Sequence, residues 1–149
     1  MCIQSLTTIL TTIIAILVAI ITGGQWITNR ARLRHELFDR RYAMYETIAS
    51  FLAEIAIHGA VQESADRKFL IATNKAYFVF GCDKHVKDLV SKIYRLAVEL
   101  DGLHRELESL PVGKQRSANV QHQTKIKAEL QNIFSSLEGR FEKYLRLDH

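Results

Sequence analysis

The 149-residue sequence contains only one proline, seven glycines and two cysteines. So little proline and glycine argues against a loop-rich or all-β chain, because these residues mark turns and interrupt helices. Cys2 and Cys82 lie far apart, and no Cys-x-x-Cys motif or cluster of cysteine with histidine accompanies them. The cysteines therefore indicate neither a disulfide scaffold nor a zinc site, and Cys82 is predicted to be a reduced thiol.

Charge of one sign is also in small excess. Twenty Lys and Arg against sixteen Asp and Glu give a net charge of +4. The surplus lies mainly in arginines that follow the first apolar run, where anionic lipid headgroups account for it. The basic segment 114–127 contains no Phe, Tyr or Trp that could stack on bases. The composition therefore predicts no nucleic-acid partner.

A long apolar run occupies the start of the chain. Residues 3–22 include no charged side chain. A helix of about 20 residues, rising about 1.5 Å per residue, crosses the roughly 30 Å hydrocarbon core of a bilayer. A signal peptide would have a basic start, a shorter apolar core and a small-x-small cleavage site, which this segment lacks. We predict a transmembrane anchor over residues 1–24, with a cleaved signal peptide and a buried soluble helix as the alternatives.

Basic residues follow the apolar run, and none precedes it. Arg30, Arg32 and Arg34 come shortly after Trp26, an indole expected at the headgroup level. These four residues form the predicted membrane interface. Because basic segments are retained on the cytoplasmic side, the N-terminus is predicted outside and residues 25–149 are predicted to form a cytoplasmic domain.

Small residues repeat at spacings of four and three within the apolar run. Side chains at these spacings lie on one face of a helix, where they allow another helix to approach closely. Either this face packs against a second copy or another membrane protein, or it reflects the ordinary composition of single spans. The predicted packing face comprises Thr8, Thr12, Ala15, Ala19 and Gly23.

Helical periodicity continues through the rest of the chain and predicts an all-α fold, an antiparallel up-and-down bundle of about four helices. We expect Gly59 and Gly81 to end the first two helices and Asp83 to cap the third. The sequence leaves open whether the first helix continues from the span through Gly23 and Gly24. The predicted helices cover residues 25–58, 62–80, 83–110 and 120–145, with a polar loop at 114–119.

Three stretches resemble a family of short bacterial and prophage-encoded membrane proteins. They are residues 33–42 (LRHELFDRRY), 80–83 (FGCD) and 141–145 (FEKYL). Members of that family have a single N-terminal span followed by a helix of the first pattern. The resemblance covers most of the chain and implies a bacterial inner-membrane location and an anchor followed by helices. It supplies no catalytic or binding residues.

The nearest approach to a catalytic motif is His35-Glu36 followed by Asp39. A zinc-protease helix needs a second histidine four residues after the first, where this chain has Asp39, and no third ligand is identifiable. We interpret the stretch as a solvated, charged helix face. If the protein were an enzyme, His35 and Glu36 would be expected to matter. No catalytic residue, metal ligand or cofactor is predicted.

Two functions remain open. The first is a single-pass inner-membrane protein whose cytoplasmic bundle acts by self-association or by binding another membrane protein. The alternative is a membrane-tethered sensor that binds a small apolar ligand or lipid between its helices. The aromatic residues that could line such a pocket, but that helical spacing assigns more simply to the core, are Phe51, Phe69, Tyr77, Phe78 and Phe80.

Overall fold

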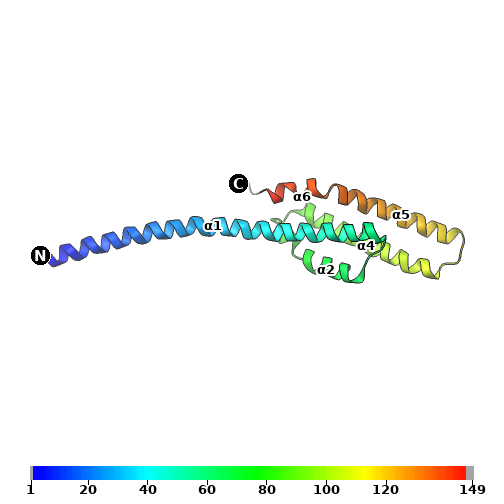
Figure 1. The fold of residues 1–149 in the computed structure, drawn as a ribbon, viewed down its shortest axis with the longest axis horizontal. Coiled ribbons are helices and arrows are strands. Elements are labelled where there is room, and N and C mark those ends of the chain that lie inside the picture. The colour runs from blue at the N-terminus through cyan, green and yellow to red at the C-terminus, as the bar shows by residue number, and fades with distance from the viewer. Residues whose placement is uncertain (1, 147–149) are drawn as a thin grey trace. The chain divides into compact units, whose positions relative to one another are not determined.

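The computed structural model describes residues 2–146, and the side chains of residues 10–62 and 65–146. The part of the chain that it describes is helical and contains no strand, which confirms the predicted all-α class. The chain divides into two compact units, one ending at Leu37 and the other starting at Phe38. Figure 1 labels the helices α1 (Cys2–His58), α2 (Glu63–Thr73), α3 (Ala76–Val79), α4 (Lys84–Ser109), α5 (Lys114–Ser135) and α6 (Leu137–Leu145).

Helix α1 is continuous through Gly23 and Gly24, so the apolar run and the helix that follows it are one element. It ends at His58 because Gly59 has a positive φ of 67° and its N–H donates to the Ile55 carbonyl at 2.8 Å. Glycine adopts this left-handed conformation without steric cost, and the bond satisfies a carbonyl at the helix end. The predicted stop at Gly59 is confirmed. The anchor boundary at residue 24 rests on hydropathy and stays a prediction.

The second unit has a hydrophobic core to which all of its helices contribute. The part of α1 after Phe38 contributes apolar residues at helical spacing, as its sequence pattern predicts. Helices α4 and α5 run in opposite directions on either side of a short turn and pack closely together (Figure 1). Fully buried core side chains include Ile48, Leu52, Phe69, Ile93, Leu100, Leu137 and Phe141.

The predicted helix over residues 62–80 is interrupted. Helix α2 ends at Thr73, and α3 begins only at Ala76. Threonine and asparagine are poor helix formers, and the Thr73 hydroxyl donates to the Phe69 carbonyl at 2.7 Å. The predicted stop at Gly81 is confirmed, since this residue has a φ of 67° and follows Phe80, the C-cap of α3.

The expectation of a polar loop at residues 114–119 is wrong, because α5 already begins at Lys114. Its first inward positions are polar, so hydrophobic periodicity could not reveal them. The predicted helix over 120–145 is also divided at Ser136, whose hydroxyl donates to the Ile133 carbonyl at 3.1 Å. Gly139 lies inside α6 without interrupting it.

Candidate functional site

The apolar segment of α1 is the first candidate site. Helix α1 is long and apolar enough to cross a membrane, with a mean hydropathy of 2.0 in its most apolar window, none of which is buried. All described side chains from Leu10 to Leu37 are exposed. A fully exposed window of such hydropathy is typical of a helix surrounded by lipid or by other apolar helices. The long apolar N-terminal helix is confirmed; its location and orientation remain predictions.

Three of the four predicted membrane-interface residues, Trp26, Arg30 and Arg32, have a side-chain contact one helical turn away. The Arg30 guanidinium lies over the Trp26 ring, 5.5 Å from its centroid. Arg32 Nε donates to Glu36 Oε1 at 3.2 Å, and Arg34 is exposed. Cation–π contacts at exposed sites contribute about 0.5–1 kcal/mol, and surface ion pairs contribute less than about 1 kcal/mol. These contacts orient the Arg30 and Arg32 side chains. The role of the basic side chains at a membrane stays a prediction.

The predicted packing face is open in the single chain. Thr12, Ala15, Ala19 and Gly23 are exposed. A Cβ atom placed on Gly23 would meet nothing within 4 Å. The side chain of Thr8 lies outside the described residues. Another helix covering this face therefore stays a prediction.

A second candidate site lies where α1, α3 and α6 meet in the second unit. Arg41, on α1, is partly buried, and its Nε donates to the Val79 carbonyl at 3.2 Å. Its Nη1 donates to the Tyr144 carbonyl at 3.4 Å. Both carbonyls lie at helix C-termini, where no intrahelical N–H is available to them. The sequence predicts that the Arg41 stem follows the core, but it gives no sign of these two acceptors.

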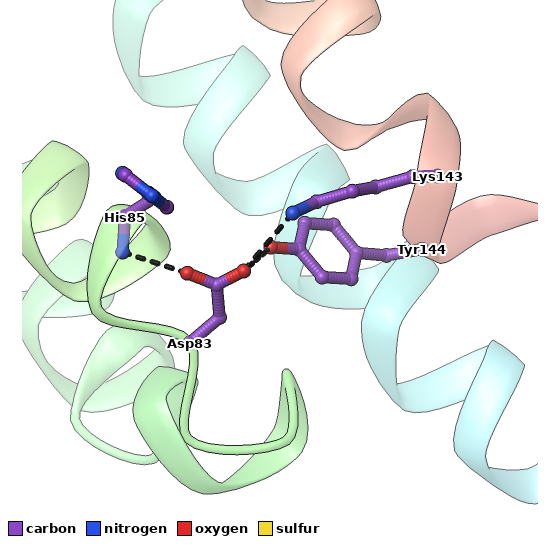
Figure 2. A network of polar contacts seen from close by, with 4 residues as sticks. All are labelled: Asp83, His85, Lys143 and Tyr144. Carbon is purple, nitrogen blue, oxygen red and sulfur yellow. Dashed lines mark hydrogen bonds and ion pairs between the residues drawn. The ribbon is translucent and has the colours of Figure 1, made fainter.

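Asp83 is the centre of a polar network that joins the start of α4 to α6 (Figure 2). Its Oδ1 accepts from the His85 main-chain N–H at 2.8 Å, which confirms the predicted helix cap. Its Oδ2 accepts from Lys143 Nζ at 3.0 Å and from the Tyr144 hydroxyl. The network therefore caps α4 and attaches α6 to it through one carboxylate.

The network also shifts the pKa of its three ionisable side chains away from their ordinary values. Hydrogen bonds from Tyr144, then Lys143, then the His85 N–H hold the pKa of Asp83 well below its usual range. Hydrogen bonding with Tyr144 and with Asp83 raises the pKa of Lys143. Burial, and then the bond to Asp83, raise the pKa of Tyr144. At neutral pH the network therefore holds a carboxylate, an ammonium and a neutral phenol.

The five aromatic residues that could have lined one pocket lie in separate places. Phe51 stacks on Phe69 with ring centroids 4.4 Å apart. Phe80 instead packs edge-to-face on Phe141, 5.2 Å away, and Phe78 is 73% exposed. Tyr77 is half-buried beside Phe78. The Phe51–Phe69 pair and Phe80 thus lie in two different parts of the core, and Phe78 lies on the surface.

An open groove of about 560 Å³ between α1 and α2 involves two of these aromatics. Phe51 and Phe69 form its floor, and Glu46, Glu54 and Lys68 are among its polar residues. Nothing in the groove resembles a set of catalytic groups. In the His35-Glu36 stretch, the nearest approach to a catalytic motif, Glu36 forms an ion pair with Arg32.

Among the described residues, no group of three His, Cys, Asp or Glu side chains could hold a metal ion. No protein-family model matches the sequence, and no match is found among curated proteins or solved structures. The resemblance to short bacterial membrane proteins therefore stays a prediction. The chemistry of the second candidate site is charge compensation and helix capping.

Proposed function

We propose that this is a single-pass bacterial inner-membrane protein whose cytoplasmic helical bundle acts by self-association or by binding another membrane protein. The observation that carries the proposal is the apolar window of α1, which is entirely unburied although the second unit has a core of its own. Burying a Leu or Ile side chain is favourable by about 1.5–3 kcal/mol, so a bilayer would stabilise this segment strongly.

The residues after the apolar run support one orientation. Trp26 and Arg30 lie together one turn apart, an aromatic and a basic group of the kind found at membrane interfaces. No Lys or Arg precedes the span, whereas Arg30, Arg32 and Arg34 follow it. The positive-inside rule then leaves the second unit in the cytoplasm.

The second unit supports a binding role through its packing. The α4–α5 hairpin, α2, α6 and the last part of α1 share one core, the arrangement expected of an antiparallel bundle. In the membrane, the small residues around Ala15 and Ala19 offer a face for a second span.

The two cysteines provide the test of location and orientation. After cell fractionation, the full-length protein should stay in the membrane pellet through an alkaline wash. In intact spheroplasts, a membrane-impermeant thiol reagent should label Cys2 in a Cys82→Ser variant. The same reagent should label Cys82 in a Cys2→Ser variant only after permeabilisation. Native protein found mainly in the soluble fraction would remove the proposal.

An affinity purification from native membranes in mild detergent would then identify what the bundle binds. A stoichiometric second protein would support a binding role, and recovery of this chain alone as an oligomer would support self-association. Recovery of the chain as a monomer without a partner would argue against both.

The sensor alternative rests on one observation, the groove between α1 and α2 with Phe51 and Phe69 at its floor. A small apolar ligand or lipid in this groove would raise the melting temperature of the full-length protein. Ala72, which lines the groove, offers a matched test. Ala72→Trp would fill the groove and should abolish the shift if the ligand binds there. No shift with any apolar ligand would remove this alternative.

A further inference from the structure

Phe78 is an exception among the phenylalanines of this protein. Of the seven, all of which the structure describes, four are buried and two are partly buried. Phe78 alone is exposed, at 73%. A single exposed apolar residue is ordinary on a protein surface, so its meaning depends on what holds it there and on what surrounds it.

The turn that carries Phe78 is firmly attached to the second unit. Ala76 and Phe80, on either side of Phe78, are each 2% exposed and form part of the core. The Val79 carbonyl accepts the hydrogen bond from Arg41. Gly81 and then Cys82 follow with positive φ, and the Cys82 N–H donates to the Tyr77 carbonyl at 2.7 Å. Phe78 is therefore presented outward by a fixed turn.

Basic side chains flank this aromatic group. Lys75 lies one turn before Phe78, and the Phe78 N–H donates to its carbonyl at 3.1 Å. The Lys87 ammonium lies over the Tyr77 ring, 5.6 Å from its centroid, and Tyr77 packs edge-on against Phe78. Lys75 and Lys87 are exposed, and neither forms an ion pair within the described residues.

The acidic residues nearby do not cancel this charge. Asp83 is engaged by the Lys143 ammonium, so its carboxylate is already compensated. The only other carboxylate in segment 74–90 is Asp88, against three lysines in the same segment. The exposed Phe78 ring is therefore accompanied by two exposed lysines, Lys75 and Lys87, that form no ion pair among the described residues. That combination suits the boundary of an anionic membrane, where aromatic rings and lysines each contribute to binding.

We propose that Lys75, Phe78 and Lys87, called here the α3 surface, dock the second unit on an anionic lipid surface. The proposal rests on the proposed function, since the anchor would tether the second unit to a membrane. Docking would restrict which face of the bundle remains available to a partner.

Cys82, exposed and four residues after Phe78, provides a reporter next to the α3 surface. The full-length Cys2→Ser protein would carry an environment-sensitive fluorophore on Cys82. It would be reconstituted in vesicles of phosphatidylcholine alone or mixed with phosphatidylglycerol. We expect a blue shift of emission, and quenching by brominated lipid, only in the anionic vesicles. About 1 M salt should reverse the shift, because the Debye length then falls to about 3 Å.

Substitutions separate docking from a change of fold. Phe78→Ser should abolish the blue shift, and Lys75→Gln combined with Lys87→Gln should reduce it. The matched controls are Val112→Ser, at a 94% exposed valine in the α4–α5 turn, and Lys114→Gln. Both controls should keep the shift, and every variant should keep the melting temperature of the parent.

Equal emission in neutral and anionic vesicles would overturn the docking proposal, as would a shift that Phe78→Ser and the lysine variants leave unchanged. An alkaline wash of the same vesicles distinguishes this failure from failure of the anchor. If the protein resists the wash but its emission does not shift, only the docking proposal fails. If the wash releases a protein whose emission had shifted beforehand, the anchor proposal fails and the docking proposal stands.

Discussion

Arg41 of α1 and Val79 of α3 are joined by a hydrogen bond of 3.2 Å from the arginine Nε to the valine main-chain oxygen. The same guanidinium reaches the Tyr144 carbonyl of α6 at 3.4 Å. One side chain therefore attaches two helix ends to a third helix. A planar guanidinium with several N–H donors suits this role, whereas an ammonium on a lysine stem does not reproduce its geometry.

We expect Arg41→Met to lower the free energy of unfolding by about 1–3 kcal/mol, because two carbonyls lose a charged donor. Methionine retains most of the apolar stem, so the loss reports mainly on the hydrogen bonds. The measurement is chemical unfolding of the full-length protein in detergent. The exposed neighbour provides the control: Arg40→Met should change stability by less than about 0.5 kcal/mol.

The bond between Asp83 and its partners predicts a pH dependence of stability. Folding lowers the pKa of Asp83, so its ionised form is favoured in the folded state. The contribution of the ionised Asp83 to the free energy of unfolding is fully present above the unfolded pKa of about 3.9. It is lost as the pH falls below that value. Asp83→Asn can still cap α4 but carries no charge. The melting-temperature difference between parent and Asp83→Asn should be constant near neutral pH and shrink below about pH 4.

An Asp83→Ala variant isolates the cap from the charge. It should melt below Asp83→Asn at neutral pH, because it also leaves the His85 N–H without its side-chain acceptor. If Asp83→Asn and Asp83→Ala melted alike, the cap would contribute nothing. A parent–Asn difference that persisted unchanged to low pH would contradict the ionised network.

Sequence patterns predicted those parts of the fold that depend on local spacing. The helix class, the buried apolar positions such as Ile48 and Ile93, the stop at Gly59 and the cap at Asp83 all follow from neighbours within one or two turns. Arg41 shows what local patterns miss. Its acceptors lie 38 and 103 residues away, and no spacing in the sequence indicates them.

The start of α5 was missed for a related reason. Asn119 is 6% exposed and Gln123 is 5% exposed, although polarity predicts both to face solvent. The Asn119 and Gln123 amides donate to the Leu103 carbonyl of α4 at 3.1 and 3.2 Å, and Gln123 also donates to Asn119 Oδ1 at 2.8 Å. These bonds allow the burial, and they form only once α4 and α5 are paired.

The Asn119–Gln123 pair predicts non-additive substitution effects. Gln123→Leu leaves the buried Asn119 Oδ1 without its donor and should cost about 1–3 kcal/mol of stability. Asn119→Leu should cost a similar amount. The double variant replaces both partners with apolar groups and should be more stable than the sum of the single effects implies. A double-mutant cycle by chemical unfolding measures this coupling, and strictly additive effects would contradict it.

The apolar segment predicts a strong effect of a single charge. Ile13→Asp places a carboxylate near the middle of the proposed span, residues 3–22, where insertion costs about 3 kcal/mol for an aspartate. The variant should insert less efficiently and appear in the alkaline-extractable fraction. Val112→Asp is the control, because that valine is 94% exposed in the second unit. Equal membrane retention of both variants would argue against a lipid-embedded segment.

The small residues of α1 predict how two anchors would meet. Ala19 and Gly23 lie on one face, and both are exposed in the single chain. Ala19→Leu would separate two closely packed helices by adding bulk at the contact, so a membrane two-hybrid signal should fall. Ile21 lies about 200° around the helix from Ala19, given 3.6 residues per turn. Ile21→Leu should therefore leave the signal unchanged. An unchanged signal in Ala19→Leu would remove association through this face and leave the second unit as the site of any self-association.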